Sequence, residues 1–207
     1  MHIPDGFLDP RVWGPFDLIS GSFVVIGLRR VSATLEEKAV PLMGVLAAFV
    51  FAAQMINIPV AGGISGHFLG GALAGSLLGP WPGLIVMSVV LMVQCFLFQD
   101  GGAAALGANI FNMGVLGAMG GAFLYRLGRR GIRGRRPIFW SGLWAGWMAM
   151  ILSACSCAAQ LCLSRVVAWS VGLSVIVGTH VLLGFLEGFL TGTVLESLWK
   201  IRPDLFH

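Results

Sequence analysis

Seven apolar segments account for most of the 207-residue chain. A helix needs about 20 mainly apolar residues to cross a hydrocarbon core of about 30 Å, since each residue advances it by about 1.5 Å. Hydrophobic residues make up 57% of the chain and charged residues 11%, unlike a soluble domain. The pattern predicts an all-α, polytopic integral membrane bundle of about seven transmembrane helices. The segments are 14–28, 39–56, 64–79, 82–98, 102–125, 138–163 and 168–198.

The chain has no room for a soluble catalytic domain. Its longest hydrophilic stretch runs only from Arg126 to Pro137, so residues 1–207 are expected to form a single transmembrane domain. Segment 64–79 is short and glycine-rich and is followed by Gly-Pro-Trp-Pro-Gly at 79–83. This composition favours a half-span or a tilted helix supported by protein neighbours.

Basic residues predict the orientation, because Lys and Arg accumulate in short cytoplasmic loops. With the amino terminus outside and the carboxyl terminus in the cytoplasm, only Arg11 and Arg165 remain outside. The same rule explains the basic stretch 126–136, so nucleic acid is not an expected partner. The residues placed inside are Arg29, Arg30, Lys38, Arg126, Arg129, Arg130, Arg133, Arg135, Arg136, Lys200 and Arg202.

Small residues spaced four apart let helix backbones approach closely in lipid. Three rows have this spacing, and packing within the chain is the expected role of most of them. The rows are Gly71–Gly75–Gly79, Gly184–Gly188–Gly192 and Gly44–Ala48–Ala52.

The first two residues form a candidate metal chelate. The start MHIPDGFLDP has neither a basic nor an apolar signal region, so Met1 is expected to be retained with its amine. That amine, the amide nitrogen of His2 and the His2 imidazole can close two adjacent chelate rings on one metal. Such a set favours Ni(II) or Cu(II), with Co(II) tolerated, over Mg(II) or Ca(II). Pro4, Asp5 and Gly6 predict a turn that folds this chelate back onto the protein.

His67 is the candidate fourth ligand, since the predicted topology places it on the same outer face as Met1 and His2. If the chain is helical from residue 66, His67 shares a face with Gly71 and Gly75 and points into the bundle. A histidine at a helix start can also be a structural cap. Four polar residues near the outer ends of the fourth and fifth segments could orient His67 or satisfy the Gly101–Gly102 loop. They are Gln94, Asp100, Asn109 and Asn112.

Two ionisable residues lie within the last segment, where charges are costly. His180 and Glu187 are seven apart and share a helix face. A structural hydrogen-bonded pair is the preferred interpretation. A proton relay is the alternative, and it would make the chain a proton-coupled secondary metal transporter. The four cysteines are expected to be small buried side chains, because Cys155 and Cys157 lack the further ligands of a metal site.

Enzymatic motifs are absent from the sequence. It has no G-x-x-x-x-G-K-[ST] phosphate loop and no H-E-x-x-H zinc motif. The chain is therefore expected to be a binding or transport protein that neither hydrolyses ATP itself nor uses a cofactor, with the metal as its cargo.

Three motifs resemble the CbiM/NikM family, the metal-capture subunits of energy-coupling-factor transporters. They are Met1-His2-Ile3-Pro4-Asp5-Gly6-Phe7-Leu8, Gly66-His67-Phe68-Leu69-Gly70-Gly71, and Asp100-Gly101-Gly102 followed by Ala105-Leu106-Gly107-Ala108-Asn109. The resemblance covers essentially the whole chain. It implies a metal bound by the Met1 amine, by the amide and ring of His2, and by the ring of His67.

The resemblance also implies an assembly in a prokaryotic cell membrane. The expected partners are a coupling transmembrane subunit, cytoplasmic ATPase subunits and a small accessory membrane subunit. Ala48 and Ala52 are similar to the family's A-x-x-x-A contact for the coupling subunit. The expected function is high-affinity capture of Ni²⁺ or Co²⁺ at the extracellular face for ATP-driven import, and both ions accept nitrogen ligands.

Overall fold

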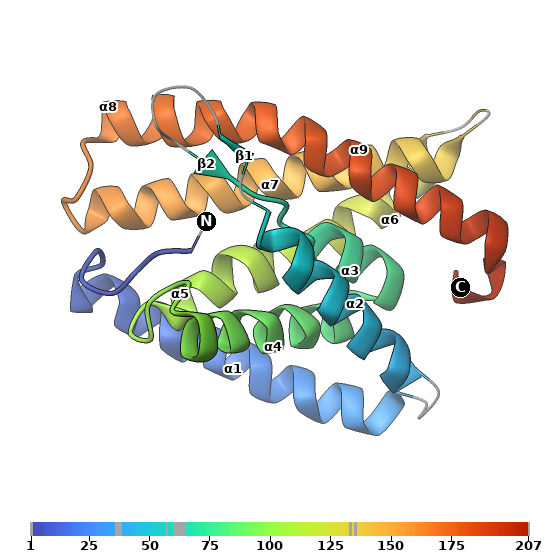
Figure 1. Cartoon of the computed structure of the whole chain (residues 1–207), viewed down its shortest axis with the longest axis horizontal. Coiled ribbons are helices and arrows are strands. Elements are labelled where there is room, and N and C mark those ends of the chain that lie inside the picture. The colour runs from blue at the N-terminus through green and yellow to red at the C-terminus, as the bar shows by residue number, and fades with distance from the viewer. Residues whose placement is uncertain are drawn as a thin grey trace.

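The computed structural model describes residues 2–35, 39–56, 58–59, 65–132, 134 and 136–206. Long helices lie alongside one another and form a bundle (Figure 1). A two-residue strand, β1 (Ile58–Pro59), pairs antiparallel with β2 (Ser65–Gly66). The helices are α1 (Pro10–Thr34), α2 (Val40–Gln54), α3 (Gly71–Leu78), α4 (Pro80–Phe98), α5 (Leu106–Ile110), the π-helix η3 (Phe111–Gly120), α6 (Gly121–Gly131), α7 (Pro137–Leu163), α8 (Trp169–Val171), the π-helix η4 (Gly172–Val177), α9 (Gly178–Ile201) and the 3-10 turn η5 (Pro203–Leu205).

These elements confirm an all-α, multi-pass membrane protein. The elements α5, η3 and α6 run on as one helix, as do α8, η4 and α9, so each predicted apolar segment contains one helical unit. Four helices are long and apolar enough to cross a membrane, and α2 is a shorter apolar helix. The four are Pro80–Phe98, Leu106–Gly131, Pro137–Leu163 and Trp169–Ile201.

Proline and capping side chains determine where several helices begin. Asp9 caps α1 by accepting a 2.8 Å hydrogen bond from the backbone N–H of Arg11, and Pro10 follows at the first helical position. Pro80 and Pro137 likewise occupy the first positions of α4 and α7. Proline is well tolerated there because the first N–H groups of a helix have no acceptor within it.

The third apolar segment is a half-span, α3, of only eight residues. It begins at Gly71 rather than at residue 66, so the expectation that His67 shares a helical face with Gly71 and Gly75 is wrong. Gly70 has a φ of +75°, a left-handed conformation that interrupts a right-handed helix. His67 therefore lies in a non-helical turn ahead of α3.

Two of the predicted glycine rows pack backbone against backbone. A β-carbon on Gly71 would lie 2.7 Å from the Met113 carbonyl oxygen, and one on Gly146 would lie 2.8 Å from Cα of Gly188. These positions tie α3 to η3 and α7 to α9. The third row does not pack within the described chain, because Gly44, Ala48 and Ala52 are all exposed.

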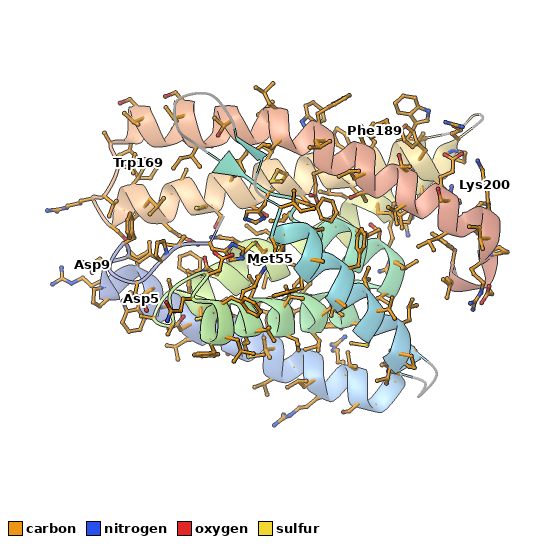
Figure 2. All side chains as sticks on the ribbon, in the orientation of Figure 1. Asp5, Asp9, Met55, Trp169, Phe189 and Lys200 are labelled. Atoms are coloured by element: carbon orange, nitrogen blue, oxygen red, sulfur yellow. The ribbon has the colours of Figure 1, made fainter. Side chains whose placement is uncertain are left out.

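Most basic residues come from helix ends at one end of the bundle, and Lys200 lies at that end, opposite Asp9 (Figure 2). Arg29 and Arg30 lie in the carboxyl-terminal part of α1, and Arg129 and Arg130 lie in the last turn of α6. Lys38, Arg133 and Arg135 lie outside the described residues. The separation of charge agrees with the predicted orientation, which remains a prediction.

Gly188→Leu should destabilise the bundle, because any β-carbon at Gly188 would run into the backbone of Leu143. We expect a loss of about 1–3 kcal/mol in the free energy of unfolding, as for other overpacked cores. Gly178→Leu on the same helix is the control, since no atom lies within 4 Å of its β-carbon position. Equal unfolding midpoints for the two variants in detergent would contradict the tight α7–α9 contact.

Candidate metal centre

The segment ahead of α1 enters the bundle instead of lying on its surface. Ile3 is only 3% exposed. Its N–H donates to Asn109 Oδ1 at 2.9 Å, and its carbonyl oxygen accepts from Asn109 Nδ2 at 3.1 Å and from the Gly102 N–H at 2.9 Å. The backbone next to His2 is thereby fixed against α5 and the loop before it.

The predicted turn after Ile3 is present. Gly6 has a φ of +85°. The Asp5 carboxylate accepts hydrogen bonds from the N–H groups of Ala103 and Ala104 at 3.0 and 2.8 Å. The turn therefore secures the start of the chain to the loop between α4 and α5.

His2 is held by residues from the end of α4. Its Nε2 lies 3.0 Å from Gln94 Oε1, which can only accept, so Nε2 carries the proton. The unprotonated nitrogen is then Nδ1, which lies 3.4 Å from Asp100 Oδ1. A cation bound at Nδ1 would therefore be next to a carboxylate.

His67 lies against His2. The ring centroids are 4.9 Å apart and the planes differ by 20°. His67 Nδ1 donates to the Phe68 carbonyl oxygen at 2.9 Å, which makes Nε2 the nitrogen suited to bind a metal. The proximity expected from topology is thus present in the structure, although the helical placement of His67 is not.

Both imidazoles are kept neutral by their surroundings. Burial, with added repulsion from the positive amino terminus, lowers the pKa of His2 to about 3. Burial also lowers the pKa of His67 well below its ordinary value, with added repulsion from the amino terminus and from His2. Neutral imidazole is the form that binds metal, so neither ring has to lose a proton first.

A buried chain of hydrogen bonds connects the supports of the two histidines. Gln94 Nε2 donates to Gln54 Oε1 at 2.8 Å, and Gln54 Nε2 donates to the Leu69 carbonyl oxygen at 2.6 Å. Gln54 is 1% exposed at the end of α2. Sequence reasoning missed it, although it is the lone polar side chain within the apolar run from Val40 to Ile56.

Glu187 supports the turn that carries His67. Its carboxylate, 1% exposed on α9, accepts from the Leu69 N–H at 2.7 Å and from the Gly70 N–H at 3.0 Å. The predicted His180–Glu187 pair is wrong, because His180 Nδ1 instead lies 2.7 Å from the Ile176 carbonyl oxygen. Seven residues advance a helix by about 10 Å, too far for a direct hydrogen bond.

The four polar residues considered as supports for His67 contact other groups in the structure. Gln94 and Asp100 contact His2, and Asn109 holds Ile3. Asn112 is not in the site, because it exchanges two hydrogen bonds with the Gln160 side chain, of 2.9 and 3.0 Å.

The described side chains alone do not form a metal site with three or more ligands. Within the described residues, no group of three or more histidine, cysteine, aspartate or glutamate side chains could hold a metal ion. All four cysteines are free thiols. A metal between His2 and His67 would therefore need donors other than the described histidine, cysteine and carboxylate side chains. Met1, which the sequence offers for this purpose, lies outside the described residues.

Comparison with known proteins agrees with this architecture. Residues 2–205 match the family model described as the cobalt uptake substrate-specific transmembrane region, CbiM. A putative metal transport protein of Haloquadratum walsbyi is 44% identical over 99% of this chain and 93% of its own length. A putative fused nickel transport protein, NikMN, of Archaeoglobus fulgidus is 40% identical over the whole of this chain and 68% of its own length.

Two further matches have lower sequence identity and still cover nearly the whole of both chains. The cobalt transport protein CbiM of Sorangium cellulosum is 34% identical over 99% of this chain and 94% of its own. A crystal structure described as a transition metal transporter superposes with a TM-score of 0.88 at 29% identity, over 97% of this chain and 93% of the other. These relatives are described as transport proteins, and the residues matched by the family model include His2 and His67. The chain belongs to the CbiM family of cobalt-uptake transmembrane proteins.

Proposed function

We propose that this chain captures Ni²⁺ or Co²⁺ through the Met1 amine, the His2 amide nitrogen and Nδ1, and His67 Nε2. The chain is a membrane protein of a metal-uptake family. The observation that carries the proposal is the stacked pair His2 and His67, whose ring centroids lie 4.9 Å apart, with a protonated nitrogen of each ring held by a hydrogen bond.

Chelate geometry supports this assignment. The amine and the amide nitrogen of His2 close a five-membered ring, and the amide nitrogen with Nδ1 closes a six-membered ring. Nδ1 is the nitrogen that the Gln94 hydrogen bond leaves unprotonated. His67 supplies a fourth nitrogen, and such a set suits Ni²⁺ and Co²⁺ better than hard cations.

Transport by this route needs an energy source, and the sequence has no phosphate-binding loop. We place the chain, as one transmembrane domain of residues 1–207, in an energy-coupling-factor importer of a prokaryotic cell membrane. Its partners would be a coupling transmembrane subunit, cytoplasmic ATPases and a small accessory membrane subunit. The exposed row at Ala48 and Ala52 on α2 offers a flat surface for the coupling subunit.

Outward capture fits the positions of the basic residues. The helix ends that carry most of them lie opposite the start of α1, and positive residues favour the cytoplasm. The histidine centre would then be loaded from the extracellular side.

The proton-coupled alternative has less support. It needs His180 and Glu187 to pass a proton, but each is engaged elsewhere. Glu187 holds the backbone of Leu69 and Gly70, and His180 bonds within its own helix.

One residue added before Met1 tests the chelate most cheaply. An inserted Ala moves the amine away from the His2 amide and leaves every helix unchanged. We expect Ni²⁺ affinity to fall by more than the roughly 10–100-fold that loss of an outer-shell partner costs. Calorimetry should compare it with a protein that carries one Ala after His207. Retained tight binding in the amino-terminal variant would refute the chelate.

Glu187→Gln separates capture from proton coupling. A glutamine offers one acceptor and turns its NH₂ toward the second backbone N–H, so the His67 turn loosens. We expect about tenfold weaker Ni²⁺ binding, within the range for outer-shell losses. Glu196→Gln on the same helix is the control, because Glu196 pairs with Arg136 and Lys200 away from the site. Unchanged binding, with loss of metal uptake by the chain alone in proteoliposomes, would favour the relay.

Acid should weaken metal binding through the backbone donors and not through the imidazoles. The pKa of His2 is about 3, so His2 stays neutral at pH 5. The amine, with an ordinary pKa of about 7.7–8.0, and the amide must both lose protons to bind. We expect affinity to fall at least about tenfold per unit from pH 7 to pH 5. A flat profile would assign the metal to the histidines without amine or amide.

A further inference from the structure

A cavity of about 570 Å³ with a partly polar lining opens at the end of the bundle where α6 and α9 finish. Helices α3, α6, α7 and α9 and the turn η5 all contribute to its lining. Its lining includes Trp199, the neighbour of Lys200, and Figure 2 shows Lys200 at the opposite end of the molecule from Asp5. Metal capture makes no use of it.

The lining of this cavity is positively charged and contains no negative charge to balance it. Arg126, Arg129 and Arg130 line the cavity, and no acidic residue does. Across the described residues none of the three forms an ion pair. The neighbouring cations behave otherwise, since Arg136 and Lys200 both pair with Glu196. Among the described residues, the three guanidinium groups therefore have no carboxylate to bind.

Ser76 on α3 adds an unsatisfied hydroxyl to the same lining. Its Oγ is buried and has no hydrogen-bond partner among the residues that the structure describes. Other buried serines bond to their own helix, as Ser88 does to the Leu84 carbonyl oxygen at 2.8 Å. An unpaired buried hydroxyl costs about 1–3 kcal/mol, so a ligand that accepts its hydrogen bond would be favoured there.

The remaining wall is apolar and aromatic. Trp199 and Phe206 meet edge to face, with ring centroids 5.4 Å apart, and Leu205 lies next to them. Trp199 lies in the last turn of a membrane-length helix, and Leu205 and Phe206 follow that helix, where lipid headgroups meet the hydrocarbon. The cavity thus combines three cations, one donor and an apolar wall at headgroup depth.

We propose that this cavity binds the phosphate of an anionic phospholipid of the phosphatidylglycerol type. Guanidinium groups bind phosphate oxygens through paired N–H donors, and the Ser76 hydroxyl can donate a further hydrogen bond. The glycerol and the start of the acyl chains would lie on Trp199 and Phe206. Basic pockets between helix ends on the cytoplasmic side suit such headgroups. The site does not depend on the metal chemistry.

Native mass spectrometry of the full chain in detergent tests the proposal, with dioleoyl-phosphatidylglycerol and dioleoyl-phosphatidylcholine as probes. The parent protein should retain phosphatidylglycerol about tenfold or more over phosphatidylcholine, since each basic residue near anionic lipid contributes about a factor of five. Changing Arg126, Arg129 and Arg130 together to Gln should abolish this preference. Ser76→Ala should weaken it severalfold.

The matched control removes the same charge elsewhere, through Arg11→Gln, Arg29→Gln and Arg165→Gln. It should keep the preference. A triple Lys variant at 126, 129 and 130 keeps the charge but loses the paired donors, so it should bind less than the parent. The proposed lipid site would be contradicted if the Lys variant retained as much phosphatidylglycerol as the parent. It would also be contradicted if the Gln variant did.

Competition with inorganic phosphate distinguishes a site for a phospholipid headgroup from a site for free phosphate. Phosphate at millimolar concentration should leave the bound phosphatidylglycerol in place. Displacement by phosphate would overturn the lipid assignment. Ni²⁺ binding should be the same in the parent and the Gln variant, so failure of the lipid site and failure of the metal site give different results.

Discussion

Two hydrogen bonds between Asn109 and the backbone of Ile3 determine where the amino-terminal segment can lie. They engage the N–H and the carbonyl of a residue that is 3% exposed, and the Gly102 N–H adds a third bond to the same carbonyl. Backbone groups away from water must find partners within the protein. Because Asn109 provides them, His2 can enter the bundle beside Gln94 instead of lying at its surface.

The His67 side of the centre depends on a similar solution. A non-helical turn at this depth leaves backbone N–H groups unpaired, and the Glu187 carboxylate accepts from two of them. Gln54 then ties the Leu69 carbonyl to Gln94 and so to His2. The two histidines are held by one connected network that crosses α2, α4 and α9, which gives a physical route by which movement of these helices would disturb a bound metal.

Hydropathy predicted the seven helical segments, because the bilayer dictates length and apolar content. The short length and glycine content of segment 64–79 indicated a half-span or a tilted helix, and the structure has the half-span. Chelate chemistry and loop topology placed His2 and His67 together. The start of α3 could not be read, since it depends on the left-handed conformation of Gly70 and on Glu187, more than 100 residues away. The role of Gln54 was not predicted, because a single amide side chain within an apolar segment does not indicate which groups it will hydrogen-bond. Spacing likewise could not show that Ala48 and Ala52 face outward while Gly188 faces α7.

X-ray absorption spectroscopy of the Ni²⁺-loaded protein identifies the atoms that bind the metal. We expect four nitrogen ligands, two of them from imidazoles, with no sulfur, and the loss of one imidazole signal in His67→Ala. A shell of six oxygen or nitrogen ligands that includes water, or one that is the same in His67→Ala, would contradict a centre built from the amino terminus, His2 and His67.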